Sequence, residues 1–353
     1  MVSPASIFLL VGPELALVEE EFERQLATAS PLVSTIGRHI RESGGKRLRP
    51  ALLLLTVKLI RGEVSPAAIN MAAVMEMLHS ATLVHDDILD NAAVRRGRAS
   101  INAKWGSDVA VLMGDWLYMT AFKMALRERS FDILDLLTSM TSLMTEGEIM
   151  QNSLNGNSRV SMSEYLEIVQ RKTAQMISAC TEIGAIVADA SKEQRRNLAT
   201  YGSLVGVAFQ LIDDLLDFVS TEEVLGKPVG SDLCEGKLTL PLIYLLENGD
   251  DAPRQMFETV MNERGFGSVT FDAVLRLLHQ HDALDRARAE ANRYAQEAID
   301  ALTEFPSNQF REALFQVPQF IVEQVQPSIA VNSTVGNLDQ VLTSSLKGRG
   351  LPI

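Results

Sequence analysis

The segment from Ser65 to Asn91 constrains the fold more than any other part of the sequence. It begins with a serine and a proline, which are favoured at the cap and first turn of a helix. It then continues to its end without glycine or a second proline, and alanine, methionine, leucine, isoleucine and valine occupy 15 of its 27 positions. A helix that is apolar on most sides has to be surrounded by other elements. We therefore expect this helix at the centre of a larger helical assembly.

The rest of the chain has the same helical periodicity, and no period-two pattern predicts a strand hairpin. The expected helices cover residues 13–27, 50–62, 107–127, 131–152, 162–189, 192–219, 237–247, 271–304 and 307–324. The sequence thus predicts an all-α fold, a helical bundle around a deep central cavity. We expect one catalytic domain over residues 1–326 and a polar, flexible C-terminal tail over residues 327–353.

Composition narrows the functional class. The chain of 353 residues has a net charge of −13, which argues against nucleic-acid binding. Cys180 and Cys234 have no metal-ligand spacing, so we expect free thiols in the reducing cytoplasm. The N-terminus lacks the basic region of a signal peptide, and no uninterrupted apolar run reaches about 18 residues. We expect a cytoplasmic protein without a transmembrane segment.

Two copies of one acidic motif, D-D-x-x-D, each follow an apolar helical stretch. They consist of Asp86, Asp87 and Asp90, and of Asp213, Asp214 and Asp217. Because positions i and i+4 lie one above the other on a helix, the outer two aspartates of each motif should point to one place. The helix dipole disfavours acids near a C-terminus, so these aspartates need cations. Hard oxygen donors of this kind suit Mg²⁺ that is shared with substrate phosphates.

A single such motif would be read more simply as a solvated helix end. Two copies, each followed by a loop with basic residues, favour a cation and phosphate site instead. An EF-hand is a poor alternative, since its glycine and distal glutamate are missing.

Basic residues accompany both motifs. "GGKRLRP" places Lys46 and Arg49 beside two glycines and ahead of a helix, a suitable anion site. Further cations stand around the acids. These are Arg95, Arg96, Lys172, Lys227 and Lys237. For each lysine alone, a solvated surface role is as good an interpretation, and a lone buried histidine such as His79 is usually part of the core.

Four segments occur in a fixed order: "GGKRLRP", "HSATLVHDDILDNAAVRRG", "QRKTAQM" and "FQLIDDLLDF" with "GKPVGSDLCEGKLTLP". Together they closely resemble the trans-polyprenyl diphosphate synthases, over roughly residues 13–326. The resemblance implies an isoprenoid-synthase fold, a homodimer and three Mg²⁺ ions. It matches Asp86, Asp90 and Asp213 to direct metal ligands. It matches Asp87, Asp214 and Asp217 to supporting acids.

The resemblance also implies two diphosphate sites. The allylic diphosphate site is matched by Arg95, Lys172, Thr173, Gln210, Lys227 and Lys237. The isopentenyl diphosphate site is matched by Lys46, Arg49, His79 and Arg96. On this interpretation both arginines of the pair bind diphosphates rather than neutralise the neighbouring aspartates. The implied catalytic groups are the six aspartates and Lys172, which stabilise the charge of the leaving diphosphate, and no side-chain nucleophile is required.

Residues just before the first motif bear on product length. Short-chain members of the family place bulky aromatics at the fourth and fifth positions before the first aspartate, where this chain has Thr82 and Ala81. One helical turn of about 5.4 Å is close to one isoprene unit. The product should therefore exceed a farnesyl chain, at about 30–50 carbons as in a quinone side-chain precursor, with octaprenyl as the central expectation. Deeper floor candidates are Leu78, Met77, Val74, Trp116, Met119, Phe122 and Met150.

Three other functions stay open. A geranylgeranyl diphosphate synthase differs only in product length. A class I terpene cyclase would carry a different second motif and would not need the "GGKRLRP" site. A non-catalytic subunit of a heteromeric synthase would be expected to have lost acids from one motif, whereas both are intact here.

Overall fold

The computed structural model describes residues 4–325 except 28, 46, 96, 226–227 and 248. Most of these residues are helical, and the two strands among them have two residues each, which confirms the predicted all-α class. The tail expected over residues 327–353 lies outside the described residues, and so do Lys46, Arg96 and Lys227.

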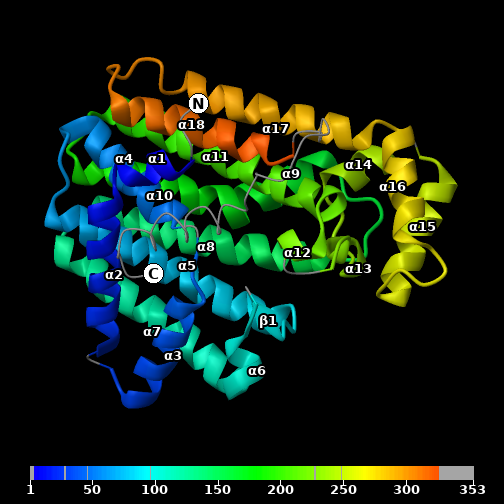
Figure 1. Cartoon of the computed structure of the whole chain (residues 1–353), viewed down its shortest axis with the longest axis horizontal. Coiled ribbons are helices and arrows are strands. Elements are labelled where there is room, and N and C mark those ends of the chain that lie inside the picture. The colour runs from blue at the N-terminus through cyan, green and yellow to red at the C-terminus, as the bar shows by residue number, and fades with distance from the viewer. Residues whose placement is uncertain are drawn as a thin grey trace.

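Long helices form the centre of the molecule (Figure 1). They are α4 (Leu48–Arg61), α5 (Pro66–Leu89), α7 (Ser107–Ala125), α8 (Phe131–Leu154), α10 (Gln175–Val187) and α11 (Lys192–Val219). As expected, α5 is buried on most sides, and it packs against α4 and α7. The hydroxyl of Ser65 accepts a hydrogen bond from the amide of Ala68 at 3.3 Å, which caps its first turn.

The remaining elements surround this centre (Figure 1). On the N-terminal side lie α1 (Pro4–Leu9), α2 (Gly12–Ala27) and α3 (Pro31–Glu42), and after α5 comes α6 (Ile101–Trp105). The later elements are η1 (Leu126–Glu128), α9 (Met162–Val169), η2 (Gln170–Ala174), α12 (Glu222–Leu225), α13 (Ser231–Cys234), α14 (Leu240–Leu246), α15 (Asp251–Glu263), α16 (Phe271–Gln280), α17 (Ala283–Asp300) and α18 (Gln309–Glu323). In Figure 1, α17 and α18 run along one side of the bundle, with α3 and α6 on the opposite side.

Two predicted helices differ from the structure. The helix expected over 162–189 contains a π-helical segment, η2, between α9 and α10. The helix expected over 271–304 is divided into α16 and α17, because Asp282 adopts a left-handed conformation with φ of 53°. The sequence predicted no strand hairpin, and this prediction was also wrong. Strands β1 (Val94–Arg95) and β2 (Arg98–Ala99) pair antiparallel, and each is too short to show a period-two pattern.

Two helices among the described residues, α5 and α7, are long and apolar enough to cross a membrane by length and composition. The window tested in α5 is 72% buried inside the protein, so α5 is a core helix. The corresponding value for α7 is 39%, because one side of α7 packs on α5 and the other exposes residues such as Leu112 and Met119.

Candidate active site

A cavity of about 520 Å³ lies among α4, α5, α7, α8, η2, α10 and α11. A second cavity of about 190 Å³ adjoins it toward α9 and the segment before α14. Four residues line both cavities, namely Lys172, Thr173, Gln210 and Asp213. The apolar part of the larger cavity includes Leu48, Leu83, Met144 and Phe209. The two cavities therefore meet at a polar boundary that consists of predicted site residues.

Asp86 is the residue of the first acidic motif that lines the larger cavity. Burial raises the pKa of its carboxyl to about 6. The charge of Lys172 opposes this shift, and the negative charges of Glu148 and Asp90 reinforce it. Asp86 and Asp90 thus interact electrostatically, as their i, i+4 spacing suggests.

Asp87 does not face this cavity. Its carboxylate is buried and lies 2.5 Å from Nε of Arg95, which belongs to strand β1. The expectation that Arg95 leaves the neighbouring acids alone was therefore wrong. The hairpin turns the chain back toward α5, and this brings the guanidinium onto the one aspartate of the motif that is deeply buried. Arg95 nevertheless also lines the cavity.

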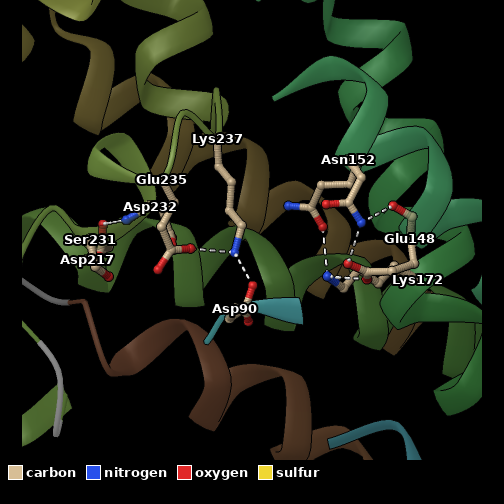
Figure 2. A network of polar contacts seen from close by, with 10 residues as sticks. Asp90, Glu148, Asn152, Lys172, Asp217, Ser231, Asp232, Glu235 and Lys237 are labelled. Atoms are coloured by element: carbon tan, nitrogen blue, oxygen red, sulfur yellow. Dashed lines mark hydrogen bonds and ion pairs between the residues drawn. The ribbon is translucent and has the colours of Figure 1, made fainter. Parts of the chain in front are cut away.

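Asp90 caps the C-terminus of α5 and is largely solvent-accessible. Nζ of Lys237 lies 3.5 Å from Asp90 and 2.6 Å from Glu235 (Figure 2). Burial disfavours the charge on Lys237, but the carboxylates of Asp90 and Glu235 outweigh it and raise the pKa of the lysine. One cation from the loop after α11 thus bridges to the end of α5.

In the second motif, Asp213 lines both cavities and is exposed, whereas Asp214 is buried. The hydroxyl of Tyr165 donates to Asp214 at 2.5 Å, and the amide of Gln210 donates to its other oxygen at 2.8 Å. Burial, together with the charges of Asp232 and Asp213, raises the pKa of Asp214 to about 7, although these two hydrogen bonds oppose the shift. The ionised form of Asp214, close to the cavities, is therefore disfavoured by its surroundings.

Asp217 has different surroundings from Asp213. It is fully buried and lines neither cavity, so it does not converge with Asp213 on one place. Its carboxylate accepts from the hydroxyl of Ser231 at 3.1 Å and from the amide of Asp232 at 3.2 Å (Figure 2). The chain returns across α11 at this point, so Asp217 anchors the first residues of α13, and its predicted supporting role stays a prediction.

The predicted metal ligands can be tested for their fit to Mg²⁺. Among the described residues, no three carboxylate, imidazole or thiol groups lie close enough to hold an ion by themselves. The donors present are nevertheless hard oxygens, and burial together with like charges leaves Asp86 short of positive charge. Such a set fits Mg²⁺, which completes its shell with water and phosphate oxygens.

Lys172 and Thr173 lie in the π-helical segment η2 and are each held by a neighbouring helix. Nζ of Lys172 lies 2.5 Å from Glu148 and donates to Gln151 at 2.7 Å, both on α8 (Figure 2). The hydroxyl of Thr173 donates to the side-chain oxygen of Gln210 on α11 at 2.8 Å. The structure thus brings together three residues predicted for the allylic diphosphate.

Arg49 and His79, predicted for the isopentenyl site, line the cavity from α4 and α5. Nη1 of Arg49 lies 3.1 Å from Nε2 of His79. Arg47 adopts a left-handed conformation with φ of 48° and forms ion pairs with Glu19 and Glu76. Arg47 thereby fixes the backbone immediately before α4.

Comparison with known proteins identifies the family and the architecture. Residues 30–276 match the polyprenyl synthetase family. The chain belongs to that family. Its members are prenyltransferases, and this chain is one of them. It is 34% identical over 315 residues to the octaprenyl diphosphate synthase of Haemophilus influenzae, covering 89% of this chain and 95% of that one.

Solved structures agree with this assignment. A decaprenyl diphosphate synthase from Rhodobacter capsulatus superposes with a TM-score of 0.86 at 30% identity, covering 92% of this chain and all of that chain. A polyprenyl synthase from Caulobacter crescentus, described as complexed with calcium and isoprenyl diphosphate, superposes with a TM-score of 0.85 at 33% identity. That likeness covers 91% of this chain and 97% of the Caulobacter chain.

In this polyprenyl synthetase family protein, the predicted chain-length residues are only partly at the cavity. Thr82 lines it, whereas Ala81 and Leu78 are fully buried and do not. Ala81 lies two residues beyond His79, about 200° around the helix, and so faces a different side. The deeper candidates do not line the cavity either, and Met119 is 65% exposed.

Sequence reasoning missed several residues that the structure places at the site. Tyr118 of α7 lines the cavity, where burial raises the pKa of its hydroxyl to about 12. Glu148 pairs with Lys172, and Tyr165 bonds Asp214. The only available signal was the helical spacing of Glu148 and Gln151, which puts both on one face of α8.

Proposed function

We propose that the chain condenses isopentenyl diphosphate with an allylic diphosphate in successive head-to-tail steps to give a long all-trans polyprenyl diphosphate. One observation carries this proposal. The first aspartates of both motifs, Asp86 and Asp213, line a single cavity that also contains Lys172 with Thr173 and Arg49 with His79. Two diphosphates can thus lie next to each other, beside an apolar wall that suits a growing hydrocarbon.

Each group has a role that follows from charge. Asp86, Asp90 and Asp213 would hold Mg²⁺, and the family pattern suggests three ions. These ions would supply positive charge to the leaving diphosphate. Lys172, Lys237 and Arg95 bind the allylic diphosphate, and their fixed cations stabilise the charge that develops as the carbon–oxygen bond breaks. The double bond of isopentenyl diphosphate, held by Arg49 and His79, then attacks the allylic carbon, and the resulting cation gives a proton to the released diphosphate.

The apolar lining has a chemical purpose as well. An allylic cation reacts with water, so the walls formed by residues such as Leu83, Met144 and Phe209 protect it. The calcium and isoprenyl diphosphate in the similar Caulobacter structure support the same substrate class.

The direct test is an incubation of the purified chain with labelled isopentenyl diphosphate, farnesyl diphosphate and Mg²⁺. Product alcohols are then sized by chromatography after dephosphorylation. We expect a series of products that ends at about 30–50 carbons, since the side chain of Thr82 at the cavity wall is small and leaves room for a growing chain. Absence of transfer with any allylic primer would contradict the proposed function, and a product of 20 carbons would favour the geranylgeranyl alternative.

Two substitutions can locate the wall that limits product length. Thr82→Phe places an aromatic ring at the cavity and should shorten the product. Tyr118→Ala removes the aromatic that the structure does place there, and should lengthen it. Ala81→Phe serves as the comparison, because Ala81 is fully buried away from the cavity lining and should lower stability more than it shortens the product.

We also propose a homodimer in the cytoplasm. Large apolar side chains are exposed along α7 and at the start and end of α8, in particular Leu112, Met119, Phe131 and Ile149. Leu112 and Met119 are seven residues apart and share a helix face. A monomer rarely exposes so many large apolar groups together. Two free cysteines support a reducing compartment. Leu112→Glu should convert a dimer to a monomer in light scattering; a monomeric wild-type chain would contradict the dimer.

A further inference from the structure

The π-helical segment η2, Gln170–Ala174, interrupts an otherwise continuous helix at the boundary of the two cavities. Its residues Lys172 and Thr173 line both cavities. π-helical turns are rare, and they are found disproportionately at functional sites. The backbone of such a turn needs support from its neighbours, because it lacks the regular α-helical hydrogen bonds.

Two glycines provide that support by letting neighbouring helices approach the backbone of η2. A Cβ atom added to Gly147 of α8 would lie 2.9 Å from Cβ of Arg171 and 3.0 Å from the backbone nitrogen of Lys172. A Cβ added to Gly206 of α11 would lie 2.5 Å from Cα of Ala174. Contacts this short do not persist, so any larger residue must push η2 away.

The same helix faces supply the polar groups that hold the two substrate-binding side chains. Gly147 directly precedes Glu148, the ion-pair partner of Lys172 at 2.5 Å. Gly206 lies four residues, or one turn, before Gln210, the acceptor for Thr173 at 2.8 Å. On both α8 and α11, the close approach of the backbones and the polar contact therefore depend on each other. If either helix moved away from η2, its bond to Lys172 or Thr173 would lengthen.

We propose that Gly147 and Gly206 are positioning residues that set the place of Lys172 and Thr173 for the allylic diphosphate. The inference rests on the proposed function, because it assigns the two glycines to one half of that site. It separates the two substrates, because Arg49 and His79 come from α4 and α5, and Arg49 is held by His79 and by Sδ of Met176 on α10, beyond η2. A methyl group at either glycine should therefore disturb one substrate and leave the other nearly unaffected.

The experiment compares Gly206→Ala and Gly147→Ala with Gly202→Ala. Gly202 is on the same helix as Gly206, and a Cβ there would lie 2.3 Å from Oγ1 of Thr181 and 2.7 Å from the carbonyl of Ile177. It is as crowded as Gly206, but its neighbours are Ile177, Ser178 and Thr181 of α10, beyond η2, of which Ile177 also lines the larger cavity. Steady-state rates are measured with Mg²⁺ while farnesyl diphosphate and isopentenyl diphosphate are varied separately, and Tm is measured for each variant.

For Gly206→Ala and Gly147→Ala we expect KM for farnesyl diphosphate to rise about tenfold or more, with KM for isopentenyl diphosphate within about twofold of wild type. Gly202→Ala should lower Tm comparably and leave both KM values unchanged. Unchanged allylic KM in the first two variants, or the same rise in Gly202→Ala, would overturn the assignment. If Gly206→Ala fails to fold, Gly147→Ala, whose contacts are less severe, decides the question. A wild-type chain without transfer would instead overturn the proposed function.

Discussion

The two acidic motifs have the same residue pattern but different surroundings. At the end of α5 the helix stops at Leu89, so Asp90 caps it and remains accessible to Lys237. In α11 the helix continues beyond the motif to Val219, and the chain then returns across Asp217 and buries it. The third aspartate is thus a solvent-facing ion-pair partner in one motif and a buried loop anchor in the other.

The middle aspartates differ in the charge of their hydrogen-bond partners, which is positive for Asp87 and neutral for Asp214. Asp87 has the Arg95 guanidinium at 2.5 Å, whereas Asp214 has a tyrosine hydroxyl and a glutamine amide. Only the first aspartates, Asp86 and Asp213, have the same role, since both line the larger cavity. The position of the helix end and the path of the next loop, rather than the motif itself, decide what the second and third acids do.

Substitution of the first aspartates, which both line the larger cavity, should have the largest effect on turnover. Asp86→Ala and Asp213→Ala each remove an anionic donor from the cavity, and each should lower turnover by about 10²–10³-fold. Circular dichroism and Tm serve as the control that folding persists. Wild-type turnover in either variant at saturating Mg²⁺ would contradict its place in the site.

The third aspartates should separate stability from activity. Asp217→Ala leaves the hydroxyl of Ser231 and the amide of Asp232 without this acceptor, and should lower the free energy of unfolding by about 2–4 kcal/mol. Asp90→Ala loses an accessible ion pair at 3.5 Å and should cost about 0–1 kcal/mol, while reducing turnover. Urea unfolding measures both. Equal losses of stability would remove the distinction between a buried anchor and an exposed cap.

The helices and the first aspartates could be predicted from sequence because both depend on local spacing. Capping by Ser65, the apolar length of α5 and the i, i+4 geometry of the motifs are properties of adjacent residues. Lys172, Thr173 and Gln210 were instead predicted through the family resemblance of their motifs, because η2 and α11 become neighbours only in the fold.

Contacts between distant segments could not be predicted. Tyr165 meets Asp214 across 49 positions of sequence, and Asp217 meets a loop whose return path no local pattern specifies. The π-helical turn has no compositional signal, because it differs from an α-helix only in hydrogen-bond register. The hairpin that carries Arg95 has two residues in each strand, too few for a periodicity.

A smaller effect than that of Asp217→Ala is expected at Asp214, because of the charge on its buried carboxyl. Its folded-state pKa of about 7 exceeds the usual value of about 3.9, so between these values the folded chain keeps a proton that the unfolded chain has lost. Stability therefore falls as pH rises through this window, and a cost remains above it. Asp214→Asn removes the charge and keeps the shape. In Mg²⁺-free buffer it should raise the free energy of unfolding at pH 8 by about 1–2 kcal/mol.

Asp87→Asn is the matched control for Asp214→Asn, since it removes a buried charge that has a cationic partner, Arg95, although burial outweighs that partner and raises the pKa of Asp87 as well. It should lower the free energy of unfolding at pH 8, by about 1 kcal/mol. The two variants should thus change stability in opposite directions although the same chemical change is made at the same motif position. Urea unfolding at pH 5 and pH 8 measures this, and the gain for Asp214→Asn should be smaller at pH 5. A loss of stability in both variants at pH 8 would show that hydrogen bonding to Asp214 outweighs the cost of its buried charge.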